Sequence, residues 1–508
     1  MNSLLFSCII ATAMAQGEGE YRLADSKQLW RLTDNAAGLA LDSSSNRGLA
    51  YFELQHHEGD YRRVQEGGQR NQLTFVTERY QKINPILVGY GAFRFDMDRT
   101  KDRSWCDVMR PYNSNPFFSG SSVSGKYDTQ QFDLTAAMGT IPLWGITAGV
   151  RLDYKVGDLS RLRDPRSRSE LLDYKLTPAL TYNYSASTFG LSGHYRRRKE
   201  KIPGMTTVQQ DPNLKYYLMS GMEQAVGTIG GYGGYSREWV DHRLGAALNY
   251  GYRNSALNSL TTIAIERGSE DVLGIYKYEP GHYTGYRYAF DSRNRLYKGH
   301  ALHQIDVELS YDEAYADEYR QQLVQERDAE KGYTSYHYET LITFKKRYQV
   351  KQLNAALHYR YTVVAGSPGN ATAGAYLGLK AAISNNKNKH LLPESELKYK
   401  YTDLTLEGGL PVAGQRLWID AEAGYHIAND ASLLLADATT DYAVGVLLPD
   451  MQYYDANYWR GHLQLTWQFP FSIKGNRNNW FVRVYGDYLS AQHSLNASTV
   501  GMAVGLYY

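Results

Sequence analysis

The stretch STVGMAVGLYY, residues 498–508, separates its side chains into two alternating sets. One set is apolar or aromatic and consists of Val500, Met502, Val504, Leu506 and Tyr508. The other set consists of Gly501, Ala503, Gly505 and Tyr507. Successive side chains of a β-strand point to opposite faces, so the pattern predicts a strand with one continuous apolar face. A face of this kind, continued up to an aromatic last residue, is typical of a strand that meets lipid.

The composition indicates a β protein. Tyr occurs 45 times and Trp 8 times in 508 residues, whereas Pro occurs only 14 times, and aromatic residues are enriched in strands. Mean hydropathy is -0.51, and no stretch past residue 15 approaches the roughly 18 apolar residues of a membrane-spanning helix. The 55 basic and 53 acidic residues leave a net charge of +2. This balance gives no bulk field that would attract nucleic acid, so we expect no nucleic-acid partner.

The same period of two recurs along most of the chain. It is clear in residues 305–311, 353–359, 417–425, 463–469 and 480–488. Many such segments reach about 10 residues, which exceeds the roughly 5 to 6 of soluble strands and fits the roughly 9 to 11 that cross a bilayer. Aromatic residues such as Trp480 and Tyr488 lie at the ends of the apolar stripes, as in the girdles of membrane barrels. We therefore predict one all-β domain over residues 48–508, a transmembrane antiparallel β-barrel of roughly 16 (about 14 to 18) strands.

The connections have two lengths. Tight turns are predicted at Asn84-Pro85, Thr140–Pro142, Ser185–Ser187, Arg347-Tyr348 and Val412–Gly414. Long polar or Gly-rich linkers are predicted at about 98–127, 156–174, 199–241, 313–333 and 429–458. In outer-membrane barrels the turns face the periplasm and the long loops face outside. The stretches 254–281 and 385–401 fall where turns are expected, so a strand is missed or added there and the strand number stays open.

The N-terminus reads as an export signal followed by a short segment. An apolar core from Leu4 to Ala11 precedes Ala13-Met14-Ala15, which predicts a signal peptide over residues 1–15, although no Lys or Arg comes before the core. Its removal takes Cys8 and leaves Cys106 alone, so we expect no internal disulfide. Residues 16–47 show weak helical spacing and precede the first clear strand. We expect this segment to be a candidate plug of the barrel.

Several of these features resemble those of a known class of membrane protein. The export signal, the Tyr-rich amphipathic strands and the last strand ending in Tyr508 resemble outer-membrane β-barrel proteins of Gram-negative bacteria. The Tyr content and the stretch YNSNPFFSG, residues 112–120, are similar to large uncharacterised barrel families of the Bacteroidota. The resemblance implies that Val504, Leu506 and Tyr508 form the signal read by the barrel-assembly machinery. LTDNAAGLAL, residues 32–41, is similar to the plug segment of fatty-acid-transporter barrels, with Ala36 where that pattern has Pro.

Charged residues occupy the predicted faces opposite lipid. The residues expected to line the lumen are Arg151, Asp153, Asp306, Glu308, His358, Arg360, Asp420, Glu422, Arg483 and Asp487. Ladders of facing charges would set ion selectivity in a wet pore. The same charges could equally pair structurally inside a plugged barrel. The sequence shows polarity and leaves both interpretations open.

Other motifs give weaker signals. The basic run from His194 to Lys199 is interpreted either as a site for the phosphates of lipopolysaccharide or an anionic solute, or as a solvated loop entrance, which we favour. His56 and His57 are neighbours on a predicted strand and point to opposite faces, so they cannot share a metal ion. Gly120–Gly125 misses the G-x-S-x-G nucleophile elbow by one residue. We therefore expect no enzyme activity, no cofactor and no metal.

The sequence thus predicts an outer-membrane β-barrel exported through a cleaved signal peptide. Its predicted function is that of a channel or transporter for a small solute. The alternative is a non-conducting subunit that pairs with a TonB-dependent transporter, a secretion apparatus or an assembly machinery. The expected partners are outer-membrane lipid and lipopolysaccharide, the barrel-assembly machinery during biogenesis, and other outer-membrane proteins.

Overall fold

One large sheet accounts for most of the molecule. The computed structural model describes residues 17–42, 46–207, 214–229, 235–327, 332–366, 370–473 and 476–508. The predicted signal peptide, residues 1–15, lies outside the described residues. The strands that build the barrel are β1 (Arg47–Gly59), β2 (Gln69–Lys82), β3 (Leu87–Arg103), β5 (Gly125–Thr140), β6 (Ile146–Arg161), β7 (Arg166–Tyr184), β8 (Ser187–Ile202), β12 (Arg237–Arg253), β13 (Leu257–Leu273), β14 (Gly281–Lys298), β15 (Ala301–Arg327), β16 (Thr334–Ala365), β17 (Thr372–His390), β18 (Ser395–Val412), β19 (Leu417–Leu434), β20 (Tyr458–Ile473), β21 (Asn476–Ala491) and β22 (Asn496–Tyr507).

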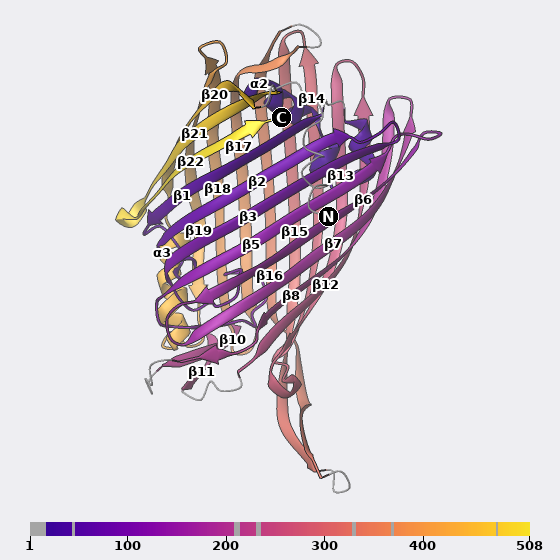
Figure 1. Cartoon of the computed structure of the whole chain (residues 1–508). Coiled ribbons are helices and arrows are strands. Elements are labelled where there is room, and N and C mark those ends of the chain that lie inside the picture. Colours follow the sequence, from indigo (N-terminus) through magenta and orange to yellow (C-terminus); the bar gives the residue numbers. More distant parts are fainter. Residues whose placement is uncertain are drawn as a thin grey trace.

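These strands close into an antiparallel barrel (Figure 1). Each barrel strand pairs with the one before it and the one after it, and β1 pairs with β22 from Leu49 opposite Tyr507 to Gly59 opposite Ala497. The sheet holds 19 strands, but β9 (Met205–Thr206) pairs only with β7, which leaves 18 strands in the barrel. Closure pairs the edge that an open sheet would expose. The predicted fold class is confirmed, with a strand number at the upper end of the predicted range.

Four predicted connections are wrong. The predicted linker 313–333 is mostly strand, because β15 continues to Arg327. The stretch 254–281 contains an additional strand, β13. The predicted linker 156–174 is mostly strand, because β6 ends at Arg161 and β7 begins at Arg166. Arg347-Tyr348 is not a turn but part of β16, which runs for 32 residues. The alternation was misleading here because the pairing of β15 with β16 shifts register twice, after Ala316 and after Arg320.

The two ends of the barrel differ (Figure 1). The end drawn at the top carries the short turns, together with the start of β1 and Tyr508; we call it the short-turn end. The opposite end, the loop end, carries connections with structure of their own. These are η3 (Val64–Glu66), β4 (Ser119–Ser121), β9, β10 (Lys215–Gly221), β11 (Gln224–Ile229), η4 (Ile275–Lys277), η5 (Ala443–Leu447), α3 (Leu448–Tyr454) and η6 (Gln492–Ser494). Beyond the loop end, β15 and β16 continue as a two-stranded hairpin.

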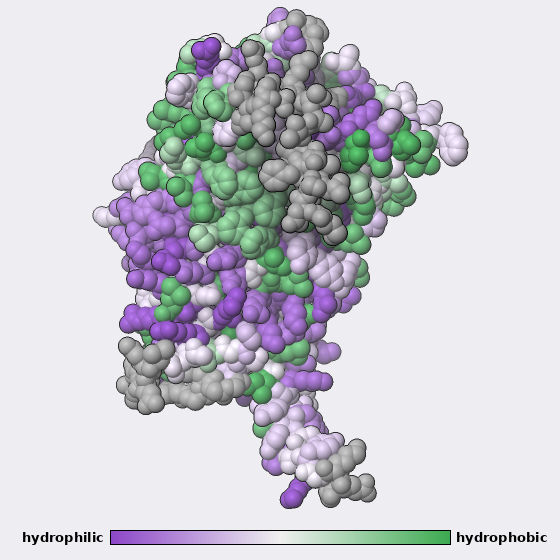
Figure 2. Space-filling view, viewed as in Figure 1, coloured by the Kyte–Doolittle hydropathy of each residue, from purple (hydrophilic) through white to green (hydrophobic). Residues whose placement is uncertain are grey.

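The outer wall is apolar over the half nearer the short-turn end. Side chains of alternate residues are exposed there, such as Phe52, Ile263 and Trp467, each about three-fifths exposed. In β22, Val500, Met502 and Val504 are exposed, whereas the residues between them are buried. Figure 2 shows hydrophobic residues gathered nearer the short-turn end and hydrophilic residues nearer the loop end on the face drawn. In the part of the chain that the structure describes, no helix has the length and apolarity needed to span a membrane.

Candidate functional site

The N-terminal segment, residues 17–42, lies inside the barrel at the short-turn end. It consists of α2 (Glu18–Lys27), η1 (Trp30–Leu32) and η2 (Ala36–Leu41). The helix α2 has acidic residues in its first turn and Lys27 in its last, which suits the helix dipole. The segment makes hydrogen bonds with β1, β6, β7, β12, β19 and β22. Because these strands lie on different sides of the barrel wall, a segment that contacts all of them occupies the lumen.

Arg22 attaches α2 to the wall. Its Nη1 and Nη2 atoms donate to the two carboxylate oxygens of Asp420 on β19, at 2.7 and 2.8 Å. This parallel arrangement is among the stronger charged contacts in proteins. The Nε atom of Arg22 donates to Glu18 at 2.7 Å, and Glu18 also accepts a hydrogen bond from Tyr507 of β22. Glu18 lies 3.9 Å from Arg483. Two predicted lumen residues therefore contact α2: Asp420 through Arg22, and Arg483 through Glu18.

The second half of the segment is also held by polar contacts. Asp34 accepts a hydrogen bond from the Nζ atom of Lys175 on β7 at 2.5 Å. The carbonyl oxygen of Thr33 accepts from Arg151 on β6 at 3.3 Å. The side-chain amide of Asn35 donates to Asn249 on β12 at 2.9 Å. Salt bridges and hydrogen bonds therefore fix this half on three neighbouring parts of the wall.

Glycines in the wall let the segment approach closely. A Cβ atom at Gly149 would lie 2.3 Å from the backbone nitrogen of Ala37, and one at Gly139 would lie 2.4 Å from the carbonyl oxygen of Ala36. Both distances are below any ordinary contact, so a side chain at either position would displace η2. The hydroxyl of Thr147 donates to the carbonyl oxygen of Ala37 at 2.7 Å. The wall is thus shaped to receive the backbone of η2.

Two of the predicted lumen residues meet at one carboxylate, and a third lies beside them. The Nε2 atom of His358 and the Nε atom of Arg360 lie 2.8 and 2.6 Å from Glu407 of β18. Asp306 on β15 lies 4.0 Å from His358 and accepts two hydrogen bonds from Arg295. Glu407 and Arg295 were not among the residues predicted to line the lumen. The signal for Glu407 was present, because it alternates with Leu404 and Leu406, which are exposed on the outer wall.

The other predicted lumen residues form local pairs, one of which, Glu422 with Lys380, also reaches Glu407 because Lys380 lies 2.7 Å from that carboxylate. These pairs are Asp153 with Arg151 at 2.9 Å, Glu308 with Arg293 at 3.7 Å, Glu422 with Lys380 at 3.8 Å and Asp487 with His462 at 2.8 Å. They lie on different strands around the barrel and do not converge on one point. The arrangement is a set of paired charges of both signs along the inner wall.

Three cavities are lined by residues of the inner wall, and two of them also contact the N-terminal segment. One of about 230 Å³ lies beside α2 and is lined by Arg22, Arg295, Asp306, His358, Arg360 and Trp418, among others. A second, of about 290 Å³, lies beside residues 32–34 and is lined by Lys175, His194, Glu266, Arg287, Asp291 and Arg293, among others. A third, of about 210 Å³, shares Arg287 and Asp291 with the second and reaches Tyr401 and Asp403. All three are lined by charges of both signs.

The loop end is covered by inward-folded loops, which we call the loop cap (residues 104–124, 214–229 and 435–457). Trp105, Tyr217 and Tyr442 from its three parts pack together, with ring centroids 4.6 and 5.6 Å apart for the pairs that include Trp105. A second buried cluster joins Cys106 and Tyr454 of the cap to residues of the barrel strands. Burial raises the pKa of the Cys106 thiol to about 11, which makes it unreactive at neutral pH.

Asp450 of α3 joins parts of the loop end that are distant in sequence. Its carboxylate accepts a hydrogen bond from the backbone nitrogen of Val64 at 2.8 Å and another from the hydroxyl of Tyr112. The guanidinium of Arg63 stacks 3.9 Å from the ring of Tyr112. Asp450 is only 2% exposed. Burial, opposed in part by the hydrogen bond from Tyr112, raises the pKa of Asp450 to about 6.

The basic run from His194 to Lys199 lies within β8 and not in a loop entrance. Arg196 donates two hydrogen bonds to Asp173, at 2.8 and 2.5 Å, and Arg198 pairs with the buried Glu200. These two arginines are therefore neutralised by partner carboxylates. The interpretation as a solvated loop entrance is wrong, because the run lies within β8. The pairing of Arg196 and Arg198 with carboxylates does not favour a phosphate site at these two residues.

The histidine pair and metal-binding residue types show no shared site. His56 contacts Asn71, whereas His57 contacts Thr499. Across the described ranges, no group of three or more His, Cys, Asp or Glu side chains is arranged to hold a metal ion.

Comparisons with known proteins give a family and a general likeness. The profile of a family described as a family of unknown function (DUF6850) matches residues 36–508. No curated protein matches the sequence. Among solved structures, the chain is similar to the outer membrane transporter YddB from Escherichia coli, with 7% identity, coverage of 90% of this chain and 81% of that chain, and a TM-score of 0.40. It is also similar to the FrpB iron transporter from Neisseria meningitidis, with 9% identity, coverage of 94% and 83%, and a TM-score of 0.40. A third is OccAB4 from Acinetobacter baumannii, with 8% identity, coverage of 92% and 98%, and a TM-score of 0.35.

Proposed function

The chain belongs to the DUF6850 family of unknown function, and we propose that it is an outer-membrane transporter for small polar solutes, held closed by a plug and a cap. The plug is the N-terminal segment 17–42, and the cap is the loop cap. The observation that carries the proposal is the polar attachment of the plug, with Arg22 on Asp420 and Asp34 on Lys175. Polar interfaces are typical of parts that separate and rejoin.

The wall supports the membrane location. A closed barrel pairs its backbone groups within the sheet, which is required where no water is present. Exposed apolar side chains on the outside would be unfavourable in water over so large an area and are favourable against lipid. Exposed aromatic residues lie at both borders of the apolar zone, with Trp144 at a short turn and Trp459 and Tyr488 nearer the loop end. The predicted export signal at residues 1–15 is consistent with this location.

The lumen supports the solute class. The cavities of about 210 to 290 Å³ inside the barrel are small and lined by carboxylates, guanidinium groups and hydroxyl or amide groups. Such linings provide donors and acceptors of both charges, which suits zwitterionic or neutral polar molecules better than apolar ones. Passage of a solute then requires the plug to leave its contacts with the wall.

A disulfide tether can test whether the plug moves. A Cβ atom at Gly19 of α2 would lie 3.3 Å from the Cβ atom of Thr372 in β17, close to the roughly 3.5–4.5 Å of disulfides. Two atoms are nearer: Oε1 of Gln415 at 2.8 Å, on a flexible side chain that can shift, and the backbone carbonyl oxygen of Ala373 at 3.0 Å, from which α2 must move by a few tenths of an ångström. The variant G19C/T372C in a C106S background would be placed in liposomes, and uptake of an amino acid and of a neutral sugar would be measured.

The proposal predicts uptake when the tether is reduced and none when it is oxidised, with reversal by reductant. The single variants G19C and T372C are the controls and should not respond to oxidation. Equal uptake in both states would show that the plug does not gate the path.

One observation favours a second function, that of a non-conducting subunit. The hairpin of β15 and β16 extends past the loop end, where, among the described strands, the two pair only with each other from Arg320 to Arg327 and from Thr334 to Ile342. It exposes Tyr336, Leu341 and Ile342. A hairpin of this kind offers free strand edges to a partner protein. Absence of uptake in every redox state, together with a partner that binds the hairpin, would favour this function.

A further inference from the structure

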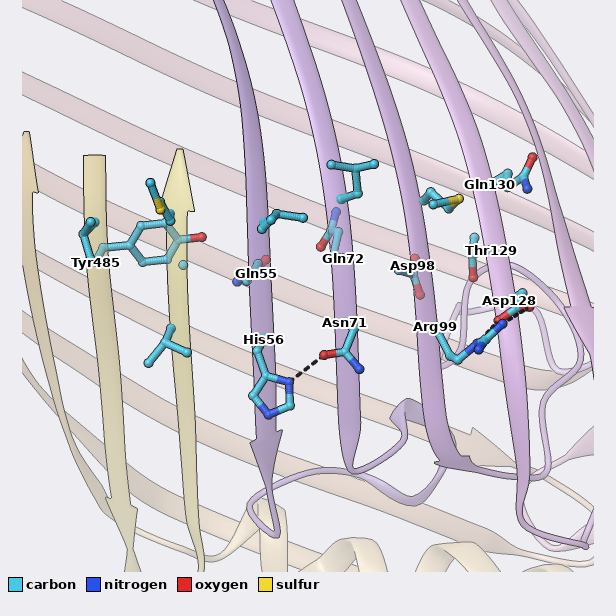
Figure 3. Close-up of a pocket in the computed structure, with 17 residues that line it drawn as sticks. Gln55, His56, Asn71, Gln72, Asp98, Arg99, Asp128, Thr129, Gln130 and Tyr485 are labelled. Atoms are coloured by element: carbon cyan, nitrogen blue, oxygen red, sulfur yellow. Dashed lines mark hydrogen bonds and ion pairs between the residues drawn. The ribbon is translucent and has the colours of Figure 1, made fainter. Parts of the chain in front are cut away.

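A groove of about 870 Å³ lies in the outer wall, across β21, β22, β1, β2, β3 and β5 (Figure 3). Its size is within the roughly 300–1,000 Å³ of small-molecule sites. The outward side chains that line it come from adjacent strands, so their positions along the membrane normal follow from the strand register.

The register divides the lining into two rows. The row nearer the short-turn end is apolar and consists of Val484, Met502, Leu54, Leu73 and Met97, which are opposite one another in successive strand pairs. The next outward row toward the loop end is polar and consists of His56, Asn71, Arg99 and Asp128. The change from apolar to polar therefore occurs within two residues on β1, β2 and β3, whereas on β22 the second row holds the apolar Val500.

The polar row carries hydrogen-bond donors. Arg99 holds Asp128 through its Nε and Nη2 atoms at 2.6 and 2.9 Å, which leaves its third nitrogen, Nη1, directed elsewhere. The Oδ1 atom of Asn71 contacts His56 at 2.7 Å, so its amide NH₂ group is available as a donor (Figure 3). Donors at this level suit a ligand that presents acceptor oxygens.

Two lysines add positive charge beyond this row. Lys101 follows Arg99 by two residues on β3, and Lys126 precedes Asp128 by two residues on β5, so both are on the outward face. Within the described residues, no ion pair is formed by Lys101 or Lys126, whereas Asp128 is paired with Arg99. The loop-end border of the groove therefore has three cationic side chains, Arg99, Lys101 and Lys126, over an apolar floor. Two carboxylates lie at the same border, Asp128 and Glu58, the latter in the same register row as Lys101.

A glycine keeps the β21 side of the groove open. Gly486 lies opposite Val500 in the same register row as His56. A Cβ atom at Gly486 would have only one neighbour within 4 Å, the carbonyl oxygen of Thr499 at 3.9 Å. The wall is open at this position, and an extended ligand can enter from this side.

We propose that this groove binds one phosphorylated, acylated lipid of the outer leaflet, of the lipopolysaccharide type. Its hydrocarbon chains would cover the apolar row, and its phosphate would meet Arg99, Lys101 and Lys126. The proposal rests on the membrane location proposed above, and it places the loop end outside the cell, where the long loops of outer-membrane barrels lie. It does not depend on transport. It places a lipid contact on the outer wall of β3 and β5, and not at the basic run of β8.

The proposal is tested by native mass spectrometry of the full chain in detergent with added lipid A. Leu54→Trp fills the apolar floor, and Ile263→Trp makes the same change at an equally exposed wall position on β13. The variant K101Q/K126Q removes the two unpaired charges. Heat-modifiable migration in gels checks that each variant is folded.

The wild type and Ile263→Trp are expected to bind one lipid A molecule, and Leu54→Trp is expected to bind none. For K101Q/K126Q, affinity is expected to fall by about thirtyfold, roughly fivefold for each lysine near an anionic group. Equal binding by wild type and Leu54→Trp would overturn the site. Equal competition by phosphatidylethanolamine would overturn the choice of lipid. A protein dimer that forms in place of the lipid complex and is lost in Leu54→Trp would assign the groove to a second copy.

Discussion

At the scale of single residues, Asp450 shows how one buried carboxyl holds a loop. It connects α3 to Val64 and Tyr112, which lie more than 300 residues away in the sequence. Nothing in the local sequence LPDMQYY indicates this role, because an Asp near the start of a helix ordinarily faces solvent. Partners so distant in sequence are set by the closed barrel, which brings the loops together. This is why the sequence predicted the loops but not their contacts.

The raised pKa of Asp450 predicts a pH-dependent cap. A carboxyl near pKa 4 in the unfolded chain and about 6 in the folded protein binds its proton more tightly when folded. Its contribution to stability is therefore full below about pH 4 and is lost as the pH rises through about 6. Cap opening is measured by alkylation of the buried Cys106. The alkylation rate of the wild type divided by that of Asp450→Asn is expected to rise by roughly tenfold between pH 5 and 7.

The ratio removes the ordinary effect of pH on thiol reactivity, which both proteins share. Asp437→Asn, an exposed substitution in the same loop, is the matched control and should follow the wild type. A ratio that stays constant from pH 5 to 7 would show that Asp450 does not control the cap.

At the scale of elements, the strands were predictable where one face is apolar throughout. β22 was predicted from its alternation, but β13 was missed. In β13, the outward set includes Ser259 and Thr261, whereas the buried Leu260 faces the N-terminal segment and packs with Leu29 and Trp30. A strand that contacts a filled lumen has apolar residues on both faces, so its period of two is lost. The missed strand is thus a consequence of the filled lumen.

The last strand carries a prediction about assembly. The backbone nitrogen of Tyr508 donates to the carbonyl oxygen of Gly48 at 3.0 Å, and its hydroxyl lies 3.0 Å from that of Thr77. Tyr508 therefore adds contacts at the seam between β22, β1 and β2. Removal of Tyr508 is expected to lower the amount of inserted barrel strongly, while solute uptake per folded molecule changes little. The two quantities are measured by heat-modifiable migration in gels and by uptake into liposomes.

Tyr488→Ala provides the comparison, because Tyr488 is exposed on the wall of β21 away from this seam. Its amount of inserted barrel should be close to that of the wild type. If the chain without Tyr508 inserts at the wild-type level, the role of the last residue in assembly is wrong.

At the scale of the whole molecule, the sequence predicted the barrel better than the contacts inside its lumen. The barrel follows from repeated alternation, which is a local property. The N-terminal segment was expected as a candidate plug, but its attachments, such as Arg22 to Asp420 across 398 positions, depend on the closed tertiary structure. The ten charges expected in the lumen were selected by face alone. Their grouping, above all the meeting of His358 and Arg360 at Glu407, required the strand register.

If the lumen is the solute path and the N-terminal segment closes it, single-channel conductance should depend on that segment. Three proteins are compared: the full chain, a chain lacking residues 17–42, and a chain that also has residues 437–456 of the loop cap replaced by a short Gly-Ser linker. We expect no steady conductance for the full chain, openings for the chain lacking residues 17–42, and a steady open level for the chain with both changes. Unchanged conductance on removal of residues 17–42 would contradict the plug, and a folded but closed barrel after both changes would contradict the lumen as the path.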